Sequence, residues 1–140
     1  MNCYGVPKGT QIYAIGDVHG EATLLDLLLE EICKDAQARP AERRLLIYLG
    51  DYVDRGPDSR GVLDRLIAPP PDGFERLCLM GNHEEMLLCC LKGTPQVTMR
   101  WLLYGGEETC RSDVVDPSQN PDLGAEEVRR SMPQEHKELF

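Results

Sequence analysis

Apolar residues along the chain form three short runs, and each run is followed by a polar segment that contains glycine. The runs lie within residues 11–15, 45–49 and 75–80. The middle run, Leu45-Leu46-Ile47-Tyr48-Leu49, is apolar without alternation, which is typical of a parallel strand buried on both faces. The runs therefore predict three strands of one sheet.

Helical patterns separate the runs and follow the last of them. Residues 21–38 carry leucines on a wide apolar stripe, and residues 58–67 repeat the pattern over a shorter length. Two further helices are predicted over residues 84–91 and 96–103, the second ending at Gly105-Gly106. This order of elements predicts an α/β fold, a βαβαβ unit with trailing helices.

The composition changes after residue 106. From there on nine acidic residues face four basic ones, whereas the preceding part has fifteen and eleven. We expect residues 1–106 to form a half-domain and residues 107–140 to be an acidic continuation, partly disordered or folded into short helices. Pro117, Pro121 and Gly124 predict a loop there, with helical turns over residues 126–131 and 135–140.

Charge and cysteine usage narrow the class of protein. A net charge of −9 argues against a nucleic-acid binder, which needs a basic face. No apolar run approaches the ~20 residues of a membrane span, and the N-terminus lacks the pattern of a signal peptide. The six cysteines form no C-x-x-C pair, so we expect reduced thiols in a cytoplasmic protein without a membrane or nucleic-acid partner.

The polar segments after the three runs carry the candidate chemistry. They are Gly16-Asp17-Val18-His19-Gly20, Gly50-Asp51-Tyr52-Val53-Asp54-Arg55-Gly56 and Gly81-Asn82-His83-Glu84. Asp, His and Asn are costly at strand ends unless their desolvation is compensated, and bound metal ions would compensate it. The strand-helix-strand spacing predicts that all three segments meet at one edge of the sheet.

These segments resemble the GD-x-H-G, GD-x-x-D-R-G and GNHE blocks of the metal-dependent serine/threonine protein phosphatases, within the calcineurin-like metallophosphoesterases. Residues 101–109 also resemble a segment typical of the bacterial and phage branch. The resemblance implies the βαβαβ half of a four-layer α-β-β-α sandwich, with the second sheet largely missing. It also implies hydrolysis of phosphomonoesters, by a hydroxide that two metal ions activate.

The resemblance assigns metal ligands residue by residue. Asp17, His19 and Asp51 would hold the first ion, Asp51 would bridge, and Asn82 would bind the second ion and the substrate. Mixed oxygen and imidazole donors suit manganese, with iron or zinc as alternatives. The remaining roles fall on the other two motifs: His83 would protonate the leaving oxygen, Asp54 would hold its imidazole, and Arg55 would bind phosphate oxygens.

Each assignment has a structural alternative. Asp17 and Asp51 could cap helices, the two histidines could be exposed in loops, Asn82 could be a turn residue, and Arg55 could form an ion pair. Glu84 is interpreted as an acid at a helix N-terminus or as a partner of a ligand. We interpret His136 as a surface residue, and Trp101 and the pair Cys89-Cys90 as core packing.

The chain departs from the family pattern after the third motif. The family has two further histidine ligands and a second arginine downstream, and this sequence matches neither histidine block. The second metal site should therefore be incomplete. We interpret the chain as C-terminally truncated, and the sequence does not predict whether this form is active. One face of the sheet should lie uncovered, which predicts self-association, partial disorder of residues 107–140, or both.

Three functions follow from these observations. The leading hypothesis is a metallophosphatase that acts on phosphoserine and phosphothreonine in proteins. A dinucleoside tetraphosphate hydrolase would share the three motifs. A non-catalytic module that binds one metal ion and phosphate would fit the missing histidines.

Overall fold

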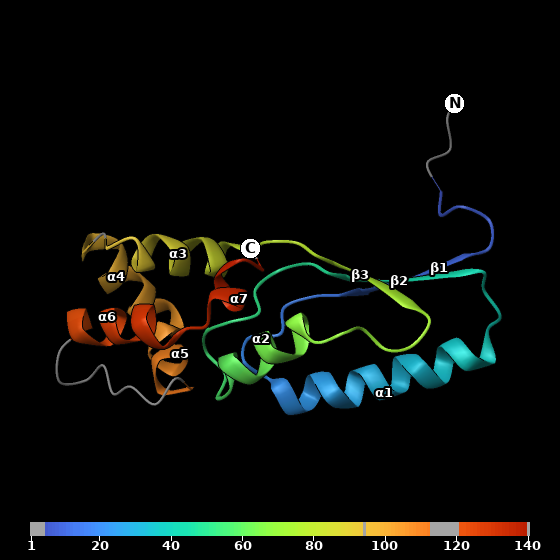
Figure 1. The fold of residues 1–140 in the computed structure, drawn as a ribbon, viewed down its shortest axis with the longest axis horizontal. Helices are drawn as coiled ribbons and strands as arrows, with labels where there is room; N and C mark the ends of the chain where they lie inside the picture. Colours follow the sequence, from blue (N-terminus) through green and yellow to red (C-terminus); the bar gives the residue numbers. More distant parts are fainter. Residues whose placement is uncertain (1–4, 94, 113–120, 140) are drawn as a thin grey trace.

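A computed structural model describes residues 5–93, 95–112 and 121–139. Three parallel strands form one sheet in the order β1, β2, β3 (Figure 1). Their bounds are β1 Thr10–Ile15, β2 Arg43–Tyr48 and β3 Phe74–Cys78. The predicted strands and the α/β class are confirmed, although β3 ends two residues earlier than the apolar run suggests.

Helices α1 (Ala22–Ala38) and α2 (Ser59–Ile67) connect the strands and lie on the same face of the sheet (Figure 1). One side of each apolar stripe points inward, where Leu25 and Leu66 are buried, whereas the other leucines of α1 include three that are exposed, Leu24, Leu27 and Leu28. Leu46 and Tyr48 of β2 are buried against them in the same core. The helical stripes read from the sequence therefore cover one sheet face, and this packing fixes the strand ends.

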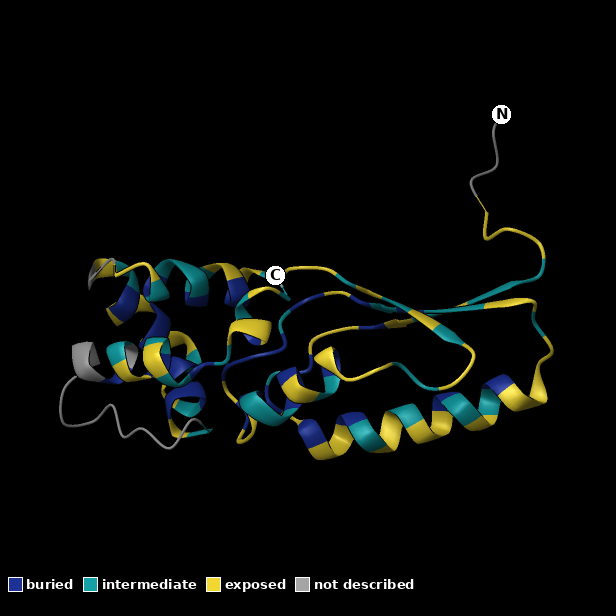
Figure 2. Ribbon diagram, in the orientation of Figure 1, coloured by how far each residue is buried: buried dark blue, intermediate teal, exposed yellow. Residues whose placement is uncertain are grey.

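Several apolar residues of the strands remain accessible, and the ribbon coloured by burial shows intermediate and exposed positions along the strands (Figure 2). The strand register pairs Ile12 with Leu45 and Ile47 with Leu77, so these side chains share one face. Ile12 is 38% exposed and Leu77 46% exposed. Within the part of the chain that the structure describes, no helix covers this face, as expected from the sequence.

The other helices gather beyond the carboxyl ends of the strands (Figure 1). They are α3 Asn82–Leu91, α4 Pro95–Trp101, α5 Glu107–Ser112, α6 Pro121–Ser131 and α7 Gln134–Lys137. Helix α6 packs on α3 and α4, and α2 contacts α5 and α7. This cluster forms a wall beside the loops that follow the strands. Among the described helices, none is both long and apolar enough to cross a membrane.

The predicted helix over residues 96–103 ends differently from expectation. A kinked helical turn, Leu102–Gly106, continues α4 directly into α5, and the kink lies at Gly105 with φ +109°. A Cβ atom at Gly105 would lie 2.7 Å from Cγ of Arg55, so only glycine fits this approach. The helical path therefore continues through residue 106, where the composition changes. Residues 113–120 lie outside the described part of the chain.

Two predictions for the acidic region are wrong. The loop expected around Pro121 and Gly124 is part of α6, because proline suits the first position of a helix. His136 is buried instead of exposed: its Nε2 lies 2.8 Å from Oδ1 of Asp64, which ties α7 to α2. A polar tail in the sequence thus packs back onto the half-domain.

Candidate active site

Backbone hydrogen bonds join the first motif loop to the second. The amides of Val18 and His19 both donate to the carbonyl of Asp51 at 2.9 Å. Gly56 allows this contact, since a Cβ atom there would lie 2.0 Å from the carbonyl oxygen of His19. The glycine therefore provides space between the two loops.

Glu84 joins the second loop to the third. Its buried carboxylate accepts hydrogen bonds from the amides of Asp51 (2.8 Å), Tyr52 (2.8 Å) and Gly81 (2.9 Å). Because these bonds are charge-assisted, they are among the stronger ones available to a loop. The interpretation of Glu84 as an acid at a helix N-terminus is confirmed, because it lies in the first turn of α3.

Four non-glycine residues of the motifs have left-handed backbone conformations. The φ angles are 43° at His19, 56° at Asp51, 72° at Asp54 and 68° at Arg55. Such a conformation costs on the order of 1–3 kcal/mol per residue and persists only where neighbouring contacts impose it. Backbone strain therefore coincides with the residues that the sequence selects for chemistry.

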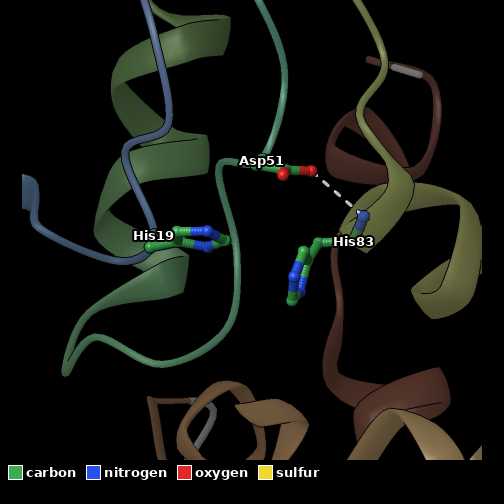
Figure 3. Close-up of side chains that lie close together, drawn as sticks. All are labelled: His19, Asp51 and His83. Atoms are coloured by element: carbon green, nitrogen blue, oxygen red, sulfur yellow. Dashed lines mark hydrogen bonds between the residues drawn. The ribbon is translucent and has the colours of Figure 1, made fainter. Parts of the chain in front are cut away.

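The first metal site has donor atoms of the expected kinds. The Nδ1–H of His19 donates to the carbonyl of Val53 at 2.8 Å, which leaves the lone pair of Nε2 for a cation. This Nε2 lies 3.7 Å from Oδ2 of Asp17. Donor atoms of His19, Asp51 and His83 all lie within 4.8 Å of one another (Figure 3). Oxygen and imidazole donors in this arrangement fit a divalent manganese, iron or zinc ion.

Asp51 has a second role in the loop geometry. Its Oδ1 accepts a hydrogen bond from the amide of His83 at 3.1 Å, in the first turn of α3 (Figure 3). The alternative that Asp51 caps a helix is therefore correct in part, but the helix is α3 rather than the one that follows its own motif. Its other carboxylate oxygen takes no part in this bond, so a bridging role stays compatible with the structure.

His83 and Asp54 form a buried pair behind the metal donors. The Nδ1–H of His83 donates to Oδ2 of Asp54 at 2.8 Å, and both side chains are inaccessible to solvent. Burial raises the pKa of Asp54, while hydrogen bonds from Thr109, His83 and Trp101 act in the opposite direction. The carboxylate fixes the imidazole orientation, which suits either a proton donor or a metal ligand at Nε2.

Two side chains outside the motifs hold Asp54. The indole Nε1–H of Trp101 lies 3.0 Å from both carboxylate oxygens, and the hydroxyl of Thr109 donates to Oδ1 at 2.6 Å. Sequence reasoning assigned Trp101 to core packing alone and missed Thr109. The available signal was the resemblance of residues 101–109 to a family segment, since both residues belong to it.

Arg55 contacts imidazoles in this structure. Its guanidinium donates to Nε2 of His19 and to Nε2 of His83, each at 3.0 Å. A lone pair binds one partner at a time, so Arg55 must release His19 when a cation binds there. Asn82 lies at the edge of the site with an exposed side chain, beside the cavity that Arg55 and His83 also line. His19, Asp51 and His83 thus come together, Asp17 lies beside His19 only, and Asn82 borders the cavity next to them.

Comparisons with known proteins agree with this site. A sequence profile of the calcineurin-like phosphoesterase family matches residues 10–127. Serine/threonine-protein phosphatase 1 of Salmonella typhimurium is 35% identical over 96 residues, which cover 69% of this chain and 39% of that protein. Serine/threonine-protein phosphatase 2 of Escherichia coli is 38% identical over 96 residues, with 69% and 38% covered.

Proteins with another name match about equally well. The symmetrical bis(5'-nucleosyl)-tetraphosphatase of Acidovorax sp. is 36% identical over 94 residues, which cover 67% of this chain and 31% of that protein. The chain thus spans about a third of the length of these relatives. The matched residues include all three motif loops, and on this basis the chain belongs to the calcineurin-like phosphoesterase family, whose members are hydrolases that use divalent metal ions.

Proposed function

We propose that this chain hydrolyses phosphomonoesters, with phosphoserine and phosphothreonine of cytoplasmic proteins as its substrates. The observation that carries the proposal is the position of the His83–Asp54 pair directly beside the metal donors of His19 and Asp51. A site that only binds phosphate has no need of an oriented imidazole beside its metal donors. Its presence favours a catalytic role over the alternative of a binding module.

Two divalent cations, manganese in the first instance, would occupy the site. Asp17, His19 and Asp51 would hold the first cation, while Asp51 and Asn82 would give the second an incomplete set of protein ligands. When bound, such cations neutralise the phosphoryl oxygens and lower the pKa of water.

The protein's own residues would do the remaining work. Once Arg55 leaves Nε2 of His83, this nitrogen would take up a proton from water and donate it to the leaving oxygen, with Asp54 holding the ring at Nδ1. Arg55 would exchange its two imidazole partners for two phosphate oxygens, since its planar fork matches both. The exposure of Arg55 leaves room for this movement.

A metal-binding measurement separates the two roles that the geometry allows for His83. We expect His83→Ala to bind Mn²⁺ with nearly unchanged affinity in isothermal titration calorimetry, whereas Asp51→Asn loses binding. Mn²⁺-dependent hydrolysis of an aryl phosphate should disappear in both variants. Loss of Mn²⁺ binding in His83→Ala would instead make His83 a ligand.

A second candidate substrate is a dinucleoside tetraphosphate, because some relatives are named for that activity. The 140-residue chain is therefore assayed with a phosphoserine peptide and with diadenosine tetraphosphate at equal concentration and fixed Mn²⁺. Faster release of phosphate from the peptide supports the proposal. Faster cleavage of the tetraphosphate would overturn its substrate class, and tight peptide binding without turnover would favour the binding module.

A further inference from the structure

A cavity of about 470 Å³ lies beside the candidate active site, between residues of α3 and α4. Arg55, Asn82 and His83 line it. Arg100 of α4 and Tyr104 of the kinked turn line the same cavity. None of the proposed metal or proton chemistry uses Arg100 or Tyr104.

The walls of the cavity differ in character. Met86 and Cys89 of α3 and Val97 of α4 supply apolar lining. The guanidinium carbon of Arg100 lies 5.6 Å from the ring centroid of Tyr104. This cation–π contact holds a positive charge at the cavity although Arg100 is exposed.

The proposed chemistry fixes which part of a substrate enters this cavity. If His83 protonates the leaving oxygen, the group attached to that oxygen must extend away from His83 on the side that is open. His83 lines the cavity together with Met86 and Arg100, so the cavity is the space available to the leaving group. For a phosphoprotein, that group is the peptide around the phosphorylated residue.

We propose that Arg100, supported by Tyr104, binds an acidic side chain of the substrate peptide close to the phosphorylated serine or threonine. The apolar lining of the cavity would contact the intervening aliphatic atoms. This inference rests on the proposed function and adds a preference for acidic sequence context. Arg100 thereby becomes a determinant of specificity, separate from the residues that act on the phosphate.

The charges along the cavity favour a peptide over a polyphosphate chain. Glu85 lines the cavity together with the two arginines, so an extended chain of several phosphates would meet a like charge. One face of the Tyr104 ring is already taken by Arg100, which leaves less of it for stacking on a nucleobase. A single carboxylate next to Arg100 brings less negative charge near Glu85 than a polyphosphate chain and needs no stacking surface.

Binding of labelled peptides tests the proposal without requiring turnover. Three phosphoserine peptides that differ at one neighbouring position, Glu, Ala or Lys, and the unphosphorylated Glu peptide are titrated with the 140-residue chain and Mn²⁺, with fluorescence anisotropy as the readout. We expect the Glu peptide to bind about 5-fold more tightly than the Ala peptide, as for an ion pair at an accessible site. Arg100→Glu should reverse the order of the Glu and Lys peptides.

Matched controls make the outcomes distinct. Arg39→Glu makes the same charge change at an exposed residue at the end of α1, and should leave the order of the peptides unchanged. Phosphate-dependent binding with equal affinity for all three peptides would overturn the role of Arg100. Binding that does not depend on the phosphate would overturn the proposed function itself. Tighter binding of diadenosine tetraphosphate that Arg100→Glu abolishes would overturn the peptide assignment.

Discussion

The indole nitrogen of Trp101 lies 3.0 Å from both carboxylate oxygens of Asp54, although 47 residues separate them in the chain. Both side chains are inaccessible to solvent, so this contact is made in the core rather than at its edge. It links the helical wall beyond the sheet to the buried partner of His83. The orientation of the candidate proton donor therefore depends on a residue outside the three motifs.

Replacing Trp101 with Phe removes this donor and keeps most of the packing. A hydrogen bond to a charged group contributes about 1.5–3 kcal/mol, so we expect the free energy of unfolding to fall by roughly that amount. Urea denaturation of Trp101→Phe, Asp54→Asn and the double variant measures the coupling between the two residues. A coupling energy near zero would show that the contact does not stabilise the fold.

Glu84→Gln tests the link between the second and third loops. The amide retains one acceptor oxygen and turns a donor toward backbone N–H groups, so at least one buried amide is left without a partner. We expect a loss of about 2–3 kcal/mol in the free energy of unfolding. Glu85→Gln, at the exposed neighbouring position of α3, is the control and should change stability little. Equal effects of the two changes would contradict the role of Glu84.

The ion pair between Asp26 and Arg65 gives a pH-dependent contribution to stability. Arg65 donates twice to the Asp26 carboxylate, at 2.6 Å each, and these bonds hold the pKa of Asp26 below its usual value. A lowered folded-state pKa stabilises the protein above the unfolded value of about 3.9, and the contribution is lost as the pH falls through the folded pKa.

Asp26→Asn should therefore reduce stability at neutral pH and have no effect at low pH. Because the pair is partly exposed, solvent screening limits the expected loss to about 0.5 kcal/mol at pH 7. Thermal unfolding of the wild type and of Asp26→Asn between pH 7 and pH 3 checks that the difference in their stability shrinks as the pH falls. A difference that grows as the pH falls would have the wrong sign for this mechanism.

The accessible sheet face should make the chain self-associate. We expect the average mass in light scattering to rise with concentration, and Leu77→Glu to shift it toward the monomer because the charge lies on this face. Leu103→Glu introduces the same charge at a residue that is 83% exposed on the kinked turn, and should not alter the mass. A wild-type monomer at all concentrations would contradict the prediction.

The strands and motif loops could be read from the sequence because they depend on local patterns. Apolar runs mark β1 to β3, and the residues directly after each run carry the candidate ligands. The hydrogen bond from Trp101 to Asp54 could not be read in the same way. It depends on the path of the chain through the kink at Gly105, which a run of helix-forming residues does not reveal.

Burial of single polar residues was equally hard to anticipate. His136 stands among charged residues, so composition favours exposure, yet its bond to Asp64 of the distant α2 places it inside. Conversely, the apolar pattern of β2 indicates burial on both faces, whereas Ile47 remains half-buried because the described chain supplies helices for one face only. For both residues, burial depends on whether another part of the chain packs against the side chain. The local sequence pattern contains no information about that packing.

The left-handed conformations of His19, Asp51, Asp54 and Arg55 have a consequence for ligand uptake. Because interloop hydrogen bonds already impose these conformations, the loss of backbone entropy occurs during folding and not when a cation arrives. Uptake of a cation then requires mainly a rotation of the Arg55 side chain. The loops are therefore preorganised for a cation. The rate of cation uptake and release should then depend on how readily Arg55 leaves His19.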